Sequence, residues 1–266
     1  MNKQSSRRTF IKSSLVTGAA TSMFPSALLA NELSYKSSSI AAGEKGLVFL
    51  FQGDSITDGN RGRNTDPNHI MGHGYAFAVA SRVGADFPER NFTFYSRGIS
   101  GNKVPDLQKR WQTDTLDLKP DVLSILIGIN DTGVGIERPA AALSIEEFET
   151  GYRNILEQSR QSNPGILFVL GVPFVYAVGK RTENWNLWND GTKKRADIVY
   201  TLAKEFNAVV VDYPSVFNMA AEKTPMSYWI WDGIHPTVFG HELMAREWIK
   251  QVSTRLKFLQ HYRKSF

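Results

Sequence analysis

The 266-residue sequence contains no cysteine. This absence excludes disulfide bonds, a thiol nucleophile, thiolate-held iron–sulfur clusters and a lipid-anchored N-terminal cysteine. Histidine is scarce, with five residues, and no internal repeat, low-complexity stretch or long apolar run follows the N-terminal region. The sequence therefore predicts a globular protein that is large enough to bury a core without disulfides, and that has no membrane-spanning helix after its N-terminal region.

Excess positive charge is confined to the N-terminal region. The formal net charge is +5, from 31 basic and 26 acidic side chains. Residues 1–30 hold four of the bases and no acid, so 27 basic and 26 acidic residues remain, a net charge of +1. No basic stripe interleaved with aromatic residues follows. The sequence therefore predicts no nucleic-acid partner.

The N-terminal residues have the pattern of a targeting segment. Arg7 and Arg8 are followed by Phe10 and Ile11, and residues 15–30 are weakly apolar and rich in Ala, Ser and Thr. This pattern resembles a twin-arginine export signal, with a general secretory signal or a basic tail as alternatives. We predict an export signal over residues 1–30, a linker over 31–46 and a single domain over 47–260. The expected location is periplasmic or extracellular, without membrane insertion after signal removal.

Short apolar segments alternate with helical patterns along the rest of the chain. Longer segments with helical spacing separate the apolar segments. Residues 174–190 are rich in Trp and Asn and predict a long loop, which is followed by a predicted helix over 191–206. This alternation is typical of an α/β protein, and five strands suit a flavodoxin-like, doubly wound parallel sheet with helices on both faces. Ligands of such sheets bind beyond the carboxyl ends of the strands. The predicted strands are 47–51, 92–95, 122–127, 165–172 and 209–212.

One serine follows the first predicted strand directly, in Gly53-Asp54-Ser55. A serine there usually caps a helix, so a catalytic reading depends on partners. Asp232 precedes His235 by three positions, with Gly233 between them. A tight turn with this spacing lets the carboxylate bind the imidazole Nδ1–H and leaves Nε2 facing outward, although an ordinary Asx turn has the same pattern.

Two further segments offer hydrogen-bond donors for an oxyanion. Gly101 follows the second predicted strand, and Asn130 follows the third. Together with the Ser55 backbone N–H, the Gly101 N–H and the Asn130 amide would make three donors around one oxygen. Taken singly, a turn at the start of a helix explains Gly101 and a helix cap explains Asn130.

The four segments together resemble the SGNH hydrolases, also called the GDSL esterase/lipase family. The resemblance spans residues 53–236 and implies the SGNH hydrolase fold. It implies that Ser55 is the nucleophile, that His235 is the general base and that Asp232 orients His235. It also implies that Ser55, Gly101 and Asn130 form the oxyanion hole, and that neither a metal nor a cofactor is needed. The matching blocks are Gly53-Asp54-Ser55, Ile99-Ser100-Gly101-Asn102, Gly128-Ile129-Asn130-Asp131 and Asp232-Gly233-Ile234-His235-Pro236.

Three finer features are similar to bacterial acetylxylan esterases and related carbohydrate acetylesterases. This similarity implies an esterase that removes acetyl groups from plant polysaccharide or its oligosaccharides. A lysophospholipase or thioesterase and a non-catalytic carbohydrate-binding protein are the alternatives. The features are Thr57-Asp58 with Arg61, Asn102-Lys103-Val104 and Trp231-Asp232-Gly233.

Aromatic side chains in the predicted loops offer faces for sugar rings, and we expect Trp185, Trp188, Trp229 and Trp231 to contact substrate. Such residues also pack loops or form subunit interfaces, which leaves a homo-oligomer open. His69 and His73 have helical spacing but lack an evident third ligand, so no metal site is predicted. Asp54 and Asp58 are expected to brace the turn and to pair within the loop.

Overall fold

The computed structural model describes residues 45–264. The predicted export signal over 1–30 lies outside the described residues, as do residues 31–44 of the predicted linker. Within the described range, no helix is long and apolar enough to cross a membrane.

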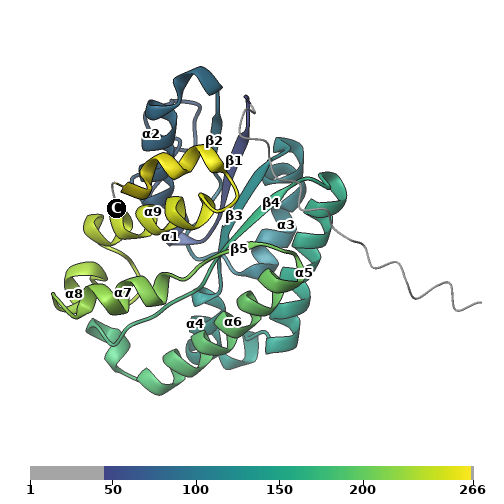
Figure 1. The fold of residues 1–266 in the computed structure, drawn as a ribbon. Coiled ribbons are helices and arrows are strands. Elements are labelled where there is room, and N and C mark those ends of the chain that lie inside the picture. The colour runs from purple at the N-terminus through teal and green to yellow at the C-terminus, as the bar shows by residue number, and fades with distance from the viewer. Residues whose placement is uncertain (1–44, 265–266) are drawn as a thin grey trace, which may run out of the picture. The chain divides into compact units, whose positions relative to one another are not determined.

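Five parallel strands form one sheet in the order β2-β1-β3-β4-β5 (Figure 1). The predicted five-stranded parallel sheet is therefore confirmed. The chain places β2 on one side of β1 and β3 on the other, so the carboxyl ends of β1 and β3 form the switch point where ligands bind in such sheets. The strands are β1 (Val48–Gly53), β2 (Thr93–Ser96), β3 (Val122–Leu126), β4 (Leu167–Gly171) and β5 (Val209–Val211).

Helices follow each strand. A capping box is present at the start of α5, where Ser144 and Glu147 exchange hydrogen bonds. The α-helices are α1 (Ser55–Asp58), α2 (Tyr75–Asp86), α3 (Val104–Asp114), α4 (Ile129–Glu137), α5 (Ile145–Ser162), α6 (Trp185–Glu205), α7 (Tyr213–Ala221), α8 (Met226–Trp229) and α9 (Val238–Val252). The 3-10 helices are η1 (Pro88–Arg90), η2 (Leu116–Leu118), η3 (Pro139–Ala141), η4 (Gly179–Thr182) and η5 (Lys257–Lys264).

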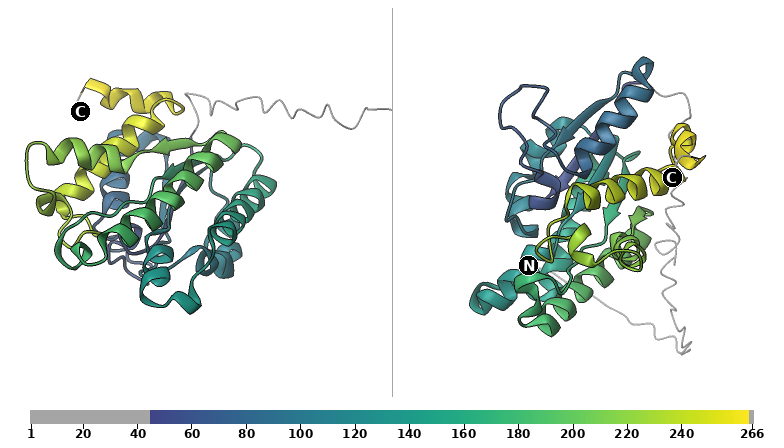
Figure 2. Two further views of the ribbon diagram at one scale, coloured as in Figure 1. Left: turned by 90° about the horizontal axis from the view of Figure 1, so that it is seen from below. Right: turned by 90° about the vertical axis from the view of Figure 1, so that its left-hand side faces the viewer.

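The two faces of the sheet are buried under different helices (Figure 2). Phe49 and Phe51 pack on one face against α2 and α9, whereas Leu50 packs on the other against α3, α5 and α6. Because successive strand side chains point to opposite faces, a strand covered on both sides must be apolar throughout. This explains the continuous apolar segments and confirms the predicted helices on both faces.

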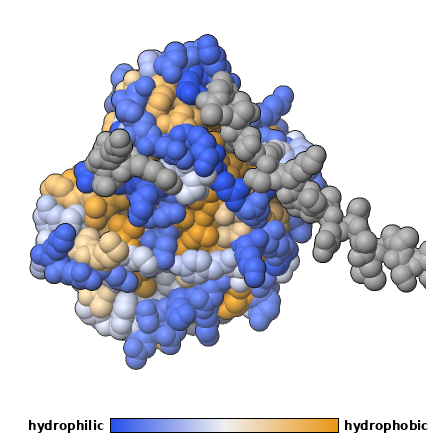
Figure 3. Space-filling model, viewed as in Figure 1, coloured by the Kyte–Doolittle hydropathy of each residue, from blue (hydrophilic) through white to orange (hydrophobic). Residues whose placement is uncertain are grey.

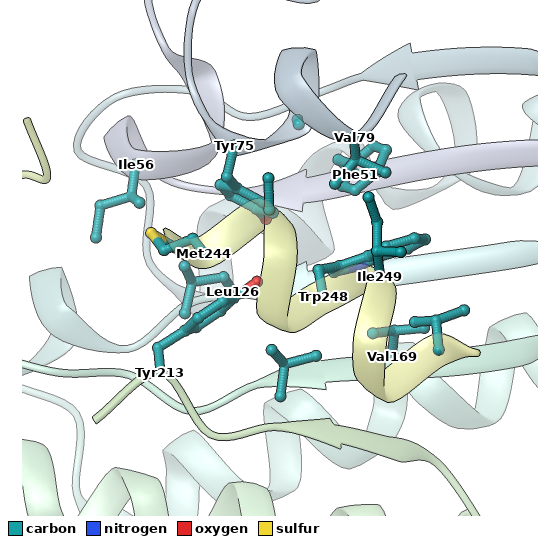
Figure 4. Packing of buried hydrophobic residues seen from close by; sticks show 14 of the residues in the cluster. Phe51, Ile56, Tyr75, Val79, Leu126, Val169, Tyr213, Met244, Trp248 and Ile249 are labelled. Carbon is teal, nitrogen blue, oxygen red and sulfur yellow. The ribbon is translucent and has the colours of Figure 1, made fainter. Parts of the chain in front are cut away.

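Trp248 of α9 lies over the sheet in the core around Phe51, Tyr75 and Met244 (Figure 4). Its ring centroid is 5.4 Å from that of Phe51. Its indole Nε1–H donates to the Ser124 hydroxyl of β3 over 3.0 Å, and both side chains are buried. The contact joins the last α-helix to the middle of the sheet.

Replacing Trp248 with phenylalanine is expected to lower the free energy of unfolding by about 1–3 kcal/mol. The substitution removes the donor to the buried Ser124 hydroxyl and leaves space that the smaller ring does not fill. Urea denaturation measures the change. Trp231→Phe, at a side chain that is 63% exposed, is the matched control and should change stability by less than about 0.5 kcal/mol. Equal effects of the two substitutions would contradict the prediction.

The predicted loop over residues 174–190 is wrong in its second half, because α6 begins at Trp185 rather than near 191. Asn and Gly in its first turns are weak helix formers and hide the helix. Tertiary packing stabilises it, because Trp188 continues the buried stripe of the helix. Gly191 lets α6 approach α4 closely, since a Cβ at this position would lie only 2.9 Å from Thr132 Cγ2. Neither α7 nor α8, which follow β5, is predicted from the sequence.

Candidate active site

Ser55 is the first residue of the short helix α1, directly after β1. Asp54 caps this helix by accepting the backbone N–H of Ile56 over 3.0 Å. Gly53 is needed at the end of the strand, because a Cβ there would lie 2.3 Å from the Leu126 carbonyl oxygen. The turn thus presents a half-buried serine at the carboxyl edge of the sheet.

Ser55 and His235 are 180 residues apart in sequence and hydrogen-bonded in the structure. The distance from Ser55 Oγ to His235 Nε2 is 2.8 Å, and His235 Nδ1 is 2.7 Å from Asp232 Oδ2. The other carboxylate oxygen, Oδ1, accepts the backbone N–H groups of Ile234 at 3.0 Å and His235 at 2.7 Å. The predicted spacing therefore forms a turn in which Asp232 holds the ring and leaves Nε2 toward the serine.

The hydrogen bonds and charges of this turn determine which atoms of Asp232 and His235 carry protons. Burial alone would raise the pKa of Asp232, but hydrogen bonds from the His235 ring and from the amides of His235 and Ile234 lower it to about 2. An ionised carboxylate only accepts, so Nδ1 of His235 carries a proton and, in the neutral ring, Nε2 accepts the Ser55 hydroxyl proton. The hydrogen bond to Asp232 raises the pKa of His235, against burial, which lowers it.

The acidic limb of the pH–rate profile is expected to have its midpoint above the ordinary histidine value of 6.5. A base must be neutral to accept a proton, so kcat/KM falls as pH drops through the raised pKa of His235. Asp232, with a pKa of about 2, stays ionised over this range. Rates of aryl acetate hydrolysis from about pH 4 to about pH 9 measure the limb.

Asp54 is the control for this assignment, because burial raises its pKa to about 7. Its charge also contributes to raising the pKa of His235. The Asp54→Asn variant should keep the acidic limb and move its midpoint to lower pH. Loss of the limb in that variant, or a midpoint at or below 6.5 in the wild type, would contradict the assignment to His235.

Gly101 lies in a loop that is fixed against α1. The backbone N–H and hydroxyl of Ser100 both donate to Asp58 Oδ2, over 3.0 and 3.1 Å. Gly101 has a φ of +81°, which favours glycine, and its missing Cβ would point into open space. Among the described hydrogen bonds, none uses the Gly101 amide as donor, so this N–H is free to bind a ligand.

Asn130 lies in the first turn of α4, after β3. Its amide Nδ2 donates one hydrogen to the carbonyl of Asn102 over 3.2 Å. The neighbouring Asp131 accepts the backbone N–H of Val104 over 3.3 Å, so α3 and α4 are joined at their starts. An amide nitrogen carries two hydrogens. The orientation of Asn130 is therefore fixed while one N–H stays available.

Asp58 and Arg181 support the site without being among the predicted site residues. Asp58 pairs with Arg63 at 2.7 Å, as expected, and also reaches Ser100. Arg181 was missed, because no local pattern marks it. Its side chain occupies the space beside Gly233, where a Cβ would lie 2.6 Å from Arg181 Cγ. Its charge partly offsets the effect of Asp232 on the pKa of His235.

The four predicted substrate-contacting tryptophans differ in position. Trp231 is 63% exposed, and its ring centroid is 6.3 Å from that of His235, at 24° between planes. Trp185 is half-buried and lines a pocket that contains none of Ser55, Asp232 and His235. Trp229 is half-buried and packs on the core. The prediction for Trp188 is wrong: the ring is 4% exposed, because it packs under Arg181, whose guanidinium carbon is 4.2 Å from the ring centroid.

Exposed apolar side chains gather on α7, α8 and the start of α9. Figure 3 shows apolar surface on the side where Figure 1 places α7 and α8. The rings of Tyr228 and Phe239 stack on each other there, with centroids 4.7 Å apart and planes at 3°. Packing within the chain therefore accounts for one face of Tyr228. The exposed residues are Met219, Tyr228, Val238 and Phe239.

The two loop histidines lie apart from this geometry. His69 is within 3.5 Å of Asp66 and its side chain is 66% exposed. Among the described residues, no group of three or more His, Cys, Asp or Glu side chains has the arrangement of a metal site.

Comparison with known proteins agrees with the geometry. Residues 51–243 match the GDSL-like Lipase/Acylhydrolase family. The chain is 33% identical over 218 residues to an acetylxylan esterase from Geobacillus stearothermophilus, across 80% of this chain and 95% of the relative.

Solved structures are similar over the same range. A GDSL-like lipase from Parabacteroides merdae superimposes with a TM-score of 0.75 at 35% identity, covering 79% of this chain and 97% of that one. An acetylxylan esterase from Geobacillus stearothermophilus superimposes with a TM-score of 0.69 at 30% identity, covering 79% and 95%. The chain therefore belongs to the GDSL-like lipase/acylhydrolase family, as its four sequence blocks predicted, and is a carboxylic ester hydrolase.

Proposed function

We propose that this protein is a serine esterase that removes O-acetyl groups from carbohydrate, with acetylated plant polysaccharide such as acetylxylan, or its oligosaccharides, as substrate. The observation that carries the proposal is the hydrogen-bonded chain from Ser55 through His235 to Asp232. The similarity to a relative named acetylxylan esterase supports the substrate class. The catalytic residues are Ser55, His235 and Asp232.

In the first half of the reaction, Ser55 Oγ attacks the ester carbonyl and passes its proton to His235 Nε2. The C–O bond to the sugar then breaks, and His235 gives that proton to the departing sugar oxygen. Asp232 stabilises the imidazolium that exists between these transfers, because it is ionised and 2.7 Å from Nδ1. The products of this half are the free sugar hydroxyl and acetyl-Ser55.

In the second half, water attacks the acetyl-serine. His235 Nε2 takes a proton from that water and returns it to Ser55 Oγ as the acyl bond breaks, which releases acetate. Each half passes through a tetrahedral oxyanion. The backbone N–H groups of Ser55 and Gly101 and the remaining N–H of Asn130 donate to it, and such prearranged donors stabilise developing charge.

Trp231 is the residue best placed to contact the sugar. Its backbone N–H donates to the His235 carbonyl over 3.1 Å, so its position follows that of residues 232–235, the catalytic loop. Its exposed ring offers a face for the C–H groups of a pyranose beside the ester.

Trp231→Ala is expected to raise KM for an acetylated xylooligosaccharide by roughly 3- to 10-fold, the size of one aromatic contact. The KM for an aryl acetate without a sugar should stay within about two-fold, because that substrate makes no such contact. Initial-rate kinetics on both substrates measure the difference. Equal increases on both substrates would show that the substitution disturbs the site itself.

Acetate release from several acetylated polysaccharides tests the substrate class, with the Ser55→Ala protein as control. A second measurement compares aryl esters of acetyl, butyryl and octanoyl groups. A hydrolysis rate that falls steeply for acyl groups longer than acetyl supports the proposal. Faster hydrolysis of octanoyl esters would favour a lipid acyl hydrolase, and saccharide binding without turnover or serine labelling by a fluorophosphonate would indicate a non-catalytic binding protein.

We further propose export by the twin-arginine route, since an enzyme acting on polysaccharide must reach it outside the cytoplasm. The support is the pair Arg7-Arg8 with the apolar residues that follow. Replacement of both arginines with lysine should leave the protein in the cytoplasmic fraction. Unchanged export of that variant would point to another route.

A further inference from the structure

A pocket lies between α6, α7 and the segment that follows β4. Its volume is about 380 Å³, within the range of roughly 300–1,000 Å³ that is usual for small-molecule sites. None of Ser55, Asp232 and His235 lines it, and neither Gly101 nor Asn130 does. The pocket is therefore separate from the ester-hydrolysing site.

Four aromatic residues, Phe174, Tyr176, Trp185 and Tyr200, line the pocket. Trp185 and Tyr200 come from one face of α6, and Tyr176 comes from the segment after β4. Trp185 and Tyr176 are half-buried, and Tyr200 is 41% exposed. The pocket thus combines apolar ring surface with access from solvent.

The polar groups of the pocket are uncharged or paired. Asn189 of α6 and Asn218 of α7 are exposed, and neither side-chain amide has a hydrogen-bond partner among the described residues. Each amide can both donate and accept. The charges of Lys193 and Asp197 offset each other across 3.3 Å. An uncharged ligand with several hydroxyl groups suits this lining better than an ion does.

We propose that this pocket binds a neutral saccharide, one or two pyranose units long. A pyranose has apolar C–H faces, which pack on aromatic rings, and hydroxyl groups, which pair with amides. Both kinds of partner line the pocket, in Trp185 and Tyr200 and in Asn189 and Asn218. The choice of a saccharide among neutral ligands rests on the proposed function.

Tyr176 connects the pocket to the catalytic loop. The backbone N–H of Tyr176 donates to the Gly233 carbonyl over 2.8 Å, and the Tyr176 hydroxyl donates to the Pro214 carbonyl over 3.1 Å. Gly233 lies between Asp232 and His235. A saccharide in this pocket is therefore separated from the catalytic residues only by the segment that contains Tyr176. The pocket increases the affinity for polymeric substrate without contacting the reacting ester.

Calorimetric titration of the full chain with non-acetylated xylotetraose tests the proposal. Trp185→Ala should weaken binding by roughly 10-fold or more, and Asn189→Ala by roughly 2- to 10-fold, since each removes a contact. Asn186→Ala is the matched control: Asn186 is exposed on the same helix but does not line the pocket. Hydrolysis of aryl acetate should stay within about two-fold in all three variants, whereas KM for acetylated xylan should rise in the first two.

If the half-buried Trp185 is necessary for folding, Asn189→Ala still tests the proposal, because Asn189 is exposed. The proposal would be overturned if Trp185→Ala and Asn189→Ala bound xylotetraose with the same affinity as Asn186→Ala. Acetate release by the wild type is measured separately. A chain that binds xylotetraose through Trp185 and Asn189 but deacetylates no polysaccharide would support the pocket and refute the proposed function.

Discussion

Replacing Ser55 with alanine is expected to lower kcat for aryl acetate hydrolysis by about 10⁴- to 10⁶-fold, the usual loss when a serine nucleophile is removed. No other group in the described site can form the acyl intermediate, because His235 and Asp232 are oriented to serve the Ser55 hydroxyl at 2.8 Å. The remaining rate would come from the oxyanion donors acting on bound ester and water.

The measurement is steady-state hydrolysis, with mass spectrometry after a fluorophosphonate to detect label on the wild-type serine. Ser81→Ala is a matched control, because Ser81 is an exposed serine on α2 whose hydroxyl donates only to the Ala78 carbonyl. Thermal unfolding should be nearly unchanged in both variants. Ser55→Ala protein that keeps a tenth or more of the wild-type rate would exclude Ser55 as nucleophile.

Replacing Asp232 with asparagine is expected to lower kcat by about 10³- to 10⁴-fold. The asparagine oxygen can still accept the backbone N–H groups of Ile234 and His235, so the turn should persist. The amide nitrogen, however, donates toward His235 Nδ1 and favours the tautomer with its proton on Nε2. That tautomer cannot accept the Ser55 proton.

The substitution also removes the largest cause of the raised pKa of His235, the hydrogen bond that its Nδ1–H donates to the Asp232 carboxylate. The acidic limb of the residual activity should therefore move to lower pH, a change that a purely structural role would not produce. Asp117→Asn, at an exposed carboxylate on η2, is the control. A loss of activity in Asp232→Asn with an unmoved limb would argue against the electrostatic role given to Asp232.

Much of the fold follows from local pattern. Strands buried on both faces must be apolar throughout, so segments such as 47–51 and 122–127 can be recognised as strands from the sequence. Their alternation with helices predicts a parallel sheet. The start of α6 could not be predicted in this way. Its first turn contains poor helix formers, and its stability comes from Trp188 packing against α4, near Gly133.

The candidate site divides similarly. Asp232 and His235 are three residues apart, so local turn geometry brings them together and the sequence predicts their pairing. The contact of Ser55 with His235 spans 180 residues, and only the four ordered blocks indicated it. The differing exposure of Trp188 and Trp231 has no local signal, because the chain around each is rich in polar and aromatic residues alike.

The sequence by itself determined the family, the sheet and the residue types at the carboxyl ends of β1 and β3, because these depend on periodicity and on short motifs. Only the tertiary structure decided which aromatic faces reach solvent and that Arg181 and Tyr176 support the catalytic loop. It alone placed a pocket between α6 and α7. Those features arise where segments distant in sequence meet, and burial is a property of the assembled elements rather than of any one of them.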